Sequence, residues 1–161
     1  KHIAYAPFMF RNRVVSTLGQ RFESIGFSDR TFHVKTIDDR LKEWYSHKTH
    51  WIVPVLNDVS LRIFDALVTG GIPIVPESLR YLAPVNGIGK DHIVFYGPDD
   101  IIDPTSVVNR AIELFDRGGL DKLVERHRFA LNFHHADNRM RQMLACAVDK
   151  FGLTPLAALE A

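Results

Sequence analysis

Residues 51–77 read WIVPVLNDVSLRIFDALVTGGIPIVPE, and they give the clearest indication of the fold class. Residues 51–56 are short, apolar and rich in branched side chains, which is typical of a strand buried on both faces of a parallel sheet. A polar turn follows, and apolar residues then recur at helical spacing over 61–68. Gly70 and Gly71 end this helix, because glycine adopts the left-handed conformation that a helix exit needs. Residues 72–75 read as a second buried strand, so the stretch predicts a strand–helix–strand unit.

Polar side chains follow both strands of this unit. Asn57, Asp58 and Ser60 come after the first strand, and Glu77 and Ser78 come after the second. Ligands of open parallel sheets bind outside the carboxyl ends of the strands. The backbone N–H groups after Ser60 begin a helix, and a helix N-terminus attracts anions such as phosphate.

The helix end alone is too weak to hold a diphosphate. Its dipole contributes about 0.3–1 kcal/mol, whereas one hydrogen bond to a charged group contributes about 1.5–3 kcal/mol. Arginines near this edge are therefore the residues that we expect to hold such a ligand, and Arg62 is in the right place.

Residues 60–75, SLRIFDALVTGGIPIV, resemble the S-x-R-x-F-E-A-x-A-x-G signature of group-1-type glycosyltransferases with the GT-B fold. The segment is similar to the spore-maturation-type branch, in which the strand ends in LN and the helix carries LRxFE; this chain has LN at 56–57 and LRIFD at 61–65. The wider superfamily has two glutamates separated by seven residues, and Asn57 and Asp65 occupy the matching positions. An amide thus replaces the first carboxylate, and a shorter carboxylate stands at the second. The resemblance covers roughly residues 51–143.

The resemblance implies a donor-binding domain that takes a nucleotide-diphospho-sugar and needs neither a metal nor another cofactor. Asp65 would hydrogen-bond the ribose hydroxyls, and Asn57 would face the sugar or the phosphates. Fixed positive groups would stabilise the charge that develops on the leaving diphosphate. The groups implied for this role are Arg62, Ser60 and one of Arg11 and Arg13. Asp58 and Glu77 lie at the same edge and are expected to be further ligand-binding residues.

Composition restricts the class of protein. The 161 residues suit one domain, and 46% hydrophobic with 24% charged residues is ordinary for a globular protein. A net charge of +1 argues against a general nucleic-acid binder. No apolar run reaches the roughly 18 residues of a membrane span. The single cysteine, Cys146, allows no internal disulfide, and we expect a cytoplasmic protein.

The chain begins with Lys1, and a GT-B enzyme needs two domains of this kind. We therefore expect residues 1–161 to be one Rossmann-like domain, the C-terminal half of a two-domain enzyme. A preceding domain would bind an acceptor that the sequence does not identify. The fragment alone is expected to be inactive.

The remaining patterns alternate between strands and helices, which predicts a three-layer α/β/α domain. Its sheet should be mostly parallel, with about five or six strands, and helices should follow at the C-terminal end. The further strands are expected at 2–10, 31–36 and 92–96, and the further helices at 14–22, from 37 onward, at 105–115, 120–133 and 137–151.

A non-catalytic nucleotide-binding or protein-interaction module on the same fold is the alternative, because Asn57 lacks a carboxylate. A receiver-like signalling domain is less favoured, because Asp38 and Asp39 are better explained by capping of the helix that they begin.

His47 and His50 have the spacing of two metal ligands on a helix. They fall where that helix should end, with no carboxylate or cysteine nearby in sequence, so no metal site is predicted. Trp44 is interpreted as a packing residue.

Overall fold

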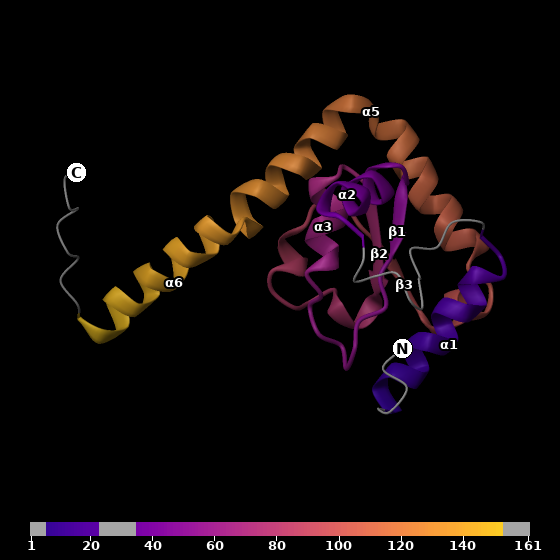
Figure 1. The fold of residues 1–161 in the computed structure, drawn as a ribbon, viewed down its shortest axis with the longest axis horizontal. Helices are drawn as coiled ribbons and strands as arrows, with labels where there is room; N and C mark the ends of the chain where they lie inside the picture. The colour runs from indigo at the N-terminus through magenta and orange to yellow at the C-terminus, as the bar shows by residue number, and fades with distance from the viewer. Residues whose placement is uncertain (1–5, 23–34, 153–161) are drawn as a thin grey trace.

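The computed structural model describes residues 6–22 and 35–152. Within them, three strands form one parallel sheet in the order β1 (Thr49–Trp51), β2 (Ile72–Pro76) and β3 (Val94–Tyr96). This part of the chain is an α/β structure with helices around a small sheet (Figure 1). The helical elements are α1 (Ala6–Gly19), α2 (Ile37–Tyr45), α3 (Arg62–Val68), η1 (Glu77–Leu79), η2 (Val85–Gly87), α4 (Pro98–Ile102), α5 (Thr105–His134) and α6 (Ala136–Phe151).

The predicted strand–helix–strand order is confirmed as β1, α3 and β2, although β1 (Thr49–Trp51) shares only Trp51 with the strand predicted at 51–56. Gly70 has a φ of 81°, and its N–H donates to the Leu67 carbonyl at 3.0 Å. The N–H of Gly71 donates to the Ala66 carbonyl at 2.9 Å, so two open carbonyls of α3 are satisfied at its end. The chain then enters β2 directly.

The first strand of the unit ends earlier than the sequence predicted. Pairing with β2 stops after Ile52, whose N–H donates to the Ile74 carbonyl at 2.9 Å. The Val55 N–H instead donates to the Asp58 carboxylate at 2.9 Å, while Leu56 and Asn57 both adopt positive φ. A side chain thus takes the backbone donor that would have continued the strand.

Helices cover both faces of the sheet. Side chains alternate between the two faces along a strand, and the alternation is visible in β2. Ile72 and Ile74 belong to the core cluster that includes Val107 and Ala111 of α5. Val75 belongs to the other core cluster, with Ile63, Ala66 and Leu67 of α3.

The long helix α5 contains a break at Gly119, where the backbone is not helical (φ 57°, ψ −160°). The sequence predicted two helices separated at 117–119, and this position agrees with that prediction. Before the break α5 packs on the sheet, and after it Ala130 joins the cluster around α3. Helix α6 continues away from the sheet (Figure 1) and has no buried residue.

The prediction of five or six strands is not confirmed, since the described residues form three. A strand over residues 2–10 is wrong for residues 6–10, which belong to α1; residues 2–5 lie outside the described part. The run HIAYAPFMF has one β-branched residue, and a short apolar run does not by itself distinguish strand from helix. Val14 and Leu18 of α1 bury against Val53.

The strand predicted at 31–36 falls mostly outside the described residues, because 31–34 are not among them. Thr36 is not in a strand and caps α2 instead. Its hydroxyl accepts the Asp39 N–H at 3.1 Å, and the Asp39 carboxylate accepts from Thr36 in return. The capping role predicted for this acidic turn is confirmed.

Gly70→Ala should destabilise the fold. A Cβ at Gly70 would lie 2.4 Å from Leu123 Cγ, on a backbone with φ 81° that side chains disfavour. We expect a loss of about 1–3 kcal/mol in the free energy of unfolding, measured with urea. Gly87→Ala is the control, because nothing lies within 4 Å of its Cβ position. Equal urea midpoints for the two variants would contradict this account.

The free energy of unfolding should fall as the pH drops from about 6.5 toward 4. Burial, and then the charge of His47, lower the pKa of His50 to about 4, and its ring stacks on Trp44 at 4.6 Å. The unfolded chain therefore takes up a proton near pH 6.5 that the folded chain does not accept. By pH 5 the loss from this residue should be about 2 kcal/mol.

The test is His50→Phe, which keeps a ring at this position and removes the titration. Its free energy of unfolding should depend less on pH between 6.5 and 4 than that of the wild type. An unchanged pH dependence would mean that His50 takes up its proton without unfolding.

Candidate functional site

The turn after β1 is tied to the turn after β2. The Ser78 hydroxyl donates to the Asn57 side-chain carbonyl oxygen at 3.0 Å. Asn57 has a φ of 57°, a conformation that asparagine tolerates better than most residues. The predicted site residue Asn57 therefore lies at the carboxyl end of both strands, where parallel sheets bind ligands.

Two arginines from different helices lie close enough at this edge for their charges to interact. Arg11, on α1, is partly buried. Burial lowers the pKa of Arg11, and the charge of Arg62 lowers this pKa further, whereas Asp58 raises it. Arg62 is the first residue of α3. Two guanidinium groups held near each other favour an anion that both can contact, because guanidinium binds phosphate through paired hydrogen bonds.

Asp65 lies three residues after Arg62 and therefore on the same side of α3. Burial raises the pKa of the Asp65 carboxyl group, and the positive charge of Arg62 opposes this rise. The sequence-predicted residues Arg62, Asp65 and Arg11 are thus brought into one electrostatic cluster, with Asp58 beside Arg11.

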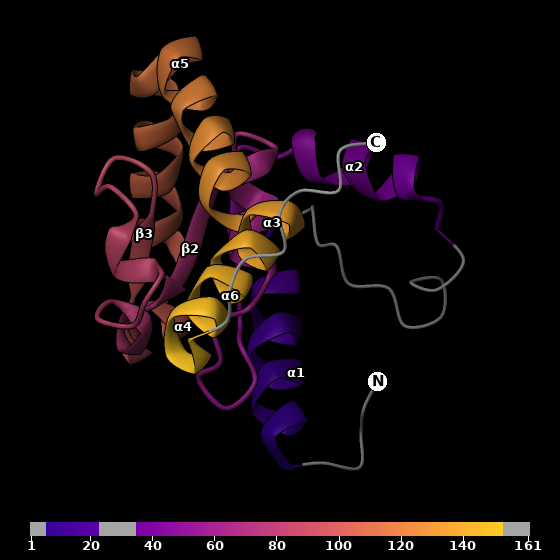
Figure 2. The same ribbon diagram turned by 90° about the vertical axis from the view of Figure 1, so that its left-hand side faces the viewer.

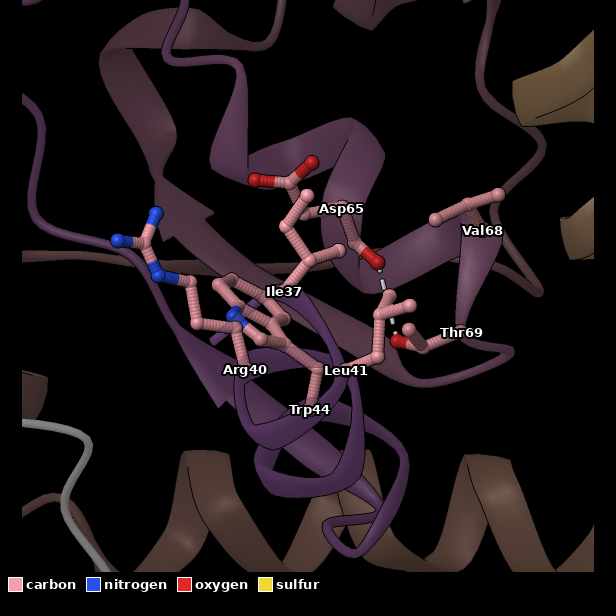
Figure 3. A pocket seen from close by; sticks show the side chains of 7 residues that line it. All are labelled: Ile37, Arg40, Leu41, Trp44, Asp65, Val68 and Thr69. Carbon is pink, nitrogen blue, oxygen red and sulfur yellow. Dashed lines mark hydrogen bonds between the residues drawn. The ribbon is translucent and has the colours of Figure 1, made fainter. Parts of the chain in front are cut away.

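Asp65 also borders a hollow of about 250 Å³ between α2 and α3, which we call the α2–α3 hollow. Figure 3 shows the Trp44 indole and Ile37 in its middle, with the Arg40 guanidinium and the Asp65 carboxylate toward one side. The hollow is lined by Ile37, Arg40, Leu41 and Trp44 of α2, and by Asp65, Val68 and Thr69.

Trp44 has two roles in this arrangement. Its ring stacks on His50 with 4.6 Å between centroids and 22° between planes, which agrees with the predicted packing role. It also lines the α2–α3 hollow, which the sequence did not predict.

Ser60 precedes α3, and its hydroxyl accepts the Arg62 N–H at 3.4 Å. The N-cap residue of α3 makes no side-chain hydrogen bond, and the helix has seven residues. A helix this short has a weak dipole, so the guanidinium groups dominate the positive potential here.

Arg11 and Arg13 were predicted to lie in a loop after a first strand. Both lie in α1 instead. Two residues along a helix correspond to a rotation of about 200°. Arg13 is exposed, while Arg11 lies in the cluster. The structure therefore selects Arg11 from the pair.

Glu77 lies in a different hollow from Asp65. It begins η1, and its carboxylate accepts hydrogen bonds from Arg80, one of them from Nη2 at 2.7 Å. Arg80 lowers the pKa of Glu77 through these hydrogen bonds and its charge, and Arg110 lowers it further. Glu77 is thus placed with Arg80 and Arg110, and no sequence pattern predicts this arrangement.

Sequence reasoning also missed Arg40, Thr69 and the second role of Trp44. The periodicity of residues 37–45 predicts the amphipathic helix α2, but it cannot predict which part of α3 that helix faces. Ser78 was expected at this edge, because it follows the second strand where Asn57 follows the first, but its hydrogen bond to Asn57 was not predicted.

In the part of the chain that the structure describes, no group of three or more His, Cys, Asp or Glu side chains is arranged to hold a metal ion. His47 and His50 lie with their ring centroids 6.4 Å apart. Among the described residues, no helix combines the length and the apolar character that crossing a bilayer requires.

Comparisons of this chain with protein-family models, with curated proteins and with solved structures found no match.

Asp58→Ala should loosen the turn after β1, because the Val55 N–H loses its acceptor. We expect a loss of about 1 kcal/mol in the free energy of unfolding, typical of one hydrogen bond. Asp58→Asn is the matched control, since its side-chain oxygen can accept the same bond. Urea denaturation should rank the stabilities as wild type, then Asn, then Ala; equal stabilities for Asn and Ala would rule out this role for the bond.

Proposed function

We propose that this chain is the donor-binding domain of a glycosyltransferase and that it binds a nucleotide-diphospho-sugar. The observation that carries the proposal is that partly buried Arg11 lies within electrostatic range of Arg62 and Asp58 near the carboxyl end of β1. The signature-like segment at residues 60–75 contributes Arg62 and Asp65 to the same place.

The arrangement supports one orientation of the nucleotide. Its diphosphate would contact Arg11 and Arg62, and its ribose hydroxyls would donate to the Asp65 carboxylate. The base would then enter the α2–α3 hollow, where Trp44 and Leu41 offer apolar surface. Pockets for whole small ligands measure roughly 300–1,000 Å³, so a hollow of about 250 Å³ suits one part of such a ligand.

In the proposed reaction, an acceptor hydroxyl oxygen forms a bond to the anomeric carbon of the sugar. The bond from that carbon to the β-phosphate oxygen breaks, and its electron pair leaves with the nucleoside diphosphate. The acceptor's proton goes to a base that we expect on an acceptor-binding domain. Arg11 and Arg62 would stabilise the charge on the leaving group without reorganising.

A nucleotide-binding module without transferase activity is the second candidate. Asn57 has an amide where the glycosyltransferase signature that this segment resembles has a carboxylate, and its side-chain oxygen already accepts a hydrogen bond from Ser78. This candidate predicts the same nucleotide affinity with no sugar transfer when the full-length protein is given a donor and acceptors.

Isothermal titration calorimetry with UDP, GDP and their sugar derivatives tests the binding proposal. Arg62→Ala should weaken the binding of the preferred nucleotide by about tenfold or more, because it removes a charge-assisted contact. Asp65→Ala should weaken the binding of nucleoside diphosphates but leave the affinity for inorganic pyrophosphate unchanged, because it removes only the ribose contact.

The matched control is Arg13→Ala, which removes an exposed arginine from the same helix as Arg11. Its nucleotide affinity should equal that of the wild type. If no nucleotide binds, or if Arg13→Ala weakens binding as much as Arg62→Ala does, the proposed site is wrong.

A further inference from the structure

A second hollow, of about 560 Å³, lies along β3, and we call it the β3 groove. One wall comes from Glu77 and Arg80 beside η1, and the other comes from Arg110, Glu113 and Arg117 on α5. Figure 2 shows β3 on the outer side of the sheet, with β2 next to it. This groove is separate from the Arg11–Arg62 cluster.

β3 is an edge strand of the sheet that the described residues form. Its Phe95 carbonyl accepts a hydrogen bond from Arg110 Nη2 at 2.9 Å, so this group points away from β2 and into the groove. The outward N–H and C=O groups of an edge strand are a template for pairing with another strand. Here the Arg110 side chain, rather than another strand, makes the hydrogen bond to this outward carbonyl.

The β3 groove has an excess of positive charge. Glu77 is bound by Arg80, and the Asp100 carboxylate accepts the Gly97 N–H at 2.7 Å, where it caps α4. Lys90 and Arg117 make no hydrogen bond or ion pair with the other described residues. Glu113 is the remaining carboxylate in the lining of the groove. Its single negative charge is outnumbered by the positive charges of Lys90, Arg110 and Arg117.

We propose that the β3 groove binds an extended acidic peptide, which pairs with β3 as an additional strand. Backbone hydrogen bonds to the Phe95 edge would supply affinity, as in other cases of strand addition. The side chains at alternate positions of an extended peptide point to one side. Acidic residues at those positions would face Arg110 and Arg117, which lie about two turns apart on α5.

Arg110 would change partner when the peptide binds. A peptide N–H takes the Phe95 carbonyl, and the guanidinium group moves from that carbonyl to a peptide carboxylate. Arg80 stays over the Phe95 ring, 4.2 Å from its centroid, and keeps that side chain in place below the edge.

The test uses fluorescence anisotropy with a labelled, end-capped peptide, Glu-Val-Glu-Val-Glu. Two comparison peptides separate the contributions: one carries N-methyl groups on alternate amides, and the other has Lys in place of Glu. We expect the acidic peptide to bind and each comparison peptide to bind at least about tenfold more weakly. The Phe95 amide signal in an NMR titration should shift with the acidic peptide.

The variant Arg117→Glu should weaken the acidic peptide by about tenfold or more, while circular dichroism shows an unchanged fold. Arg128→Glu is the matched control, because Arg128 is an exposed arginine on the same helix but outside the groove. Nucleotide binding should be equal in the two variants, since neither touches the Arg11–Arg62 cluster.

Three results would overturn the proposal. They are no binding of the acidic peptide at millimolar concentration, equal affinity for the N-methylated peptide, and equal losses in the Arg117 and Arg128 variants. The second result would assign the groove to a small anion or to charge attraction alone.

Discussion

The left-handed backbone at Gly70 is the constraint on which the arrangement of elements depends. It ends α3 after seven residues and turns the chain directly into β2. Because Gly70 has no Cβ, Leu123 of α5 can pack against its backbone. Its carbonyl also accepts from Arg126 Nε at 2.7 Å. A helix, a strand and a second helix therefore meet at one residue, and the position of α3 fixes where Arg62 and Asp65 lie.

Arg126 is the unusual member of this junction, because its side chain is fully buried. Burial lowers the pKa of Arg126, and its guanidinium lies 5.4 Å from the centre of the Phe115 ring. Its two terminal nitrogens have no hydrogen-bond partner in the described part of the chain. Burying a charge in this way is costly. The bond to Gly70 and the contact with Phe115 offset part of that cost and hold the two halves of α5 on either side of Gly119.

Two edges of the same small sheet have different chemistry. The carboxyl edge gathers Arg11, Arg62 and Asp65, which suit a compact ligand with phosphates and hydroxyls. The open edge along β3 gathers cations beside backbone groups, which suit an extended chain. Both edges exist because α3 and α5 cover the faces of the sheet and leave its margins accessible.

Local sequence signals were enough to predict α3, β2 and the turn between them. The branched run at 72–75, the helical spacing before it and the glycine pair between them are local signals, and each acts through neighbours within a few residues. The acidic first turn of α2 and the break in α5 at Gly119 were equally local. The strand prediction for residues 6–10 was wrong, because their composition allows either a strand or a helix. Burial of Val14 and Leu18 against Val53 favours the helix.

Which of the predicted site residues lie near one another depends on how the helices pack on the sheet. Arg11 rather than Arg13 approaches Arg62 because α1 presents one side to the edge of the sheet, and no local signal encodes that side. Glu77 is bound to Arg80 in the β3 groove, although it follows the same edge as Asn57. Contacts between residues far apart in the chain depend on how the helices pack, and a local sequence pattern does not predict that packing.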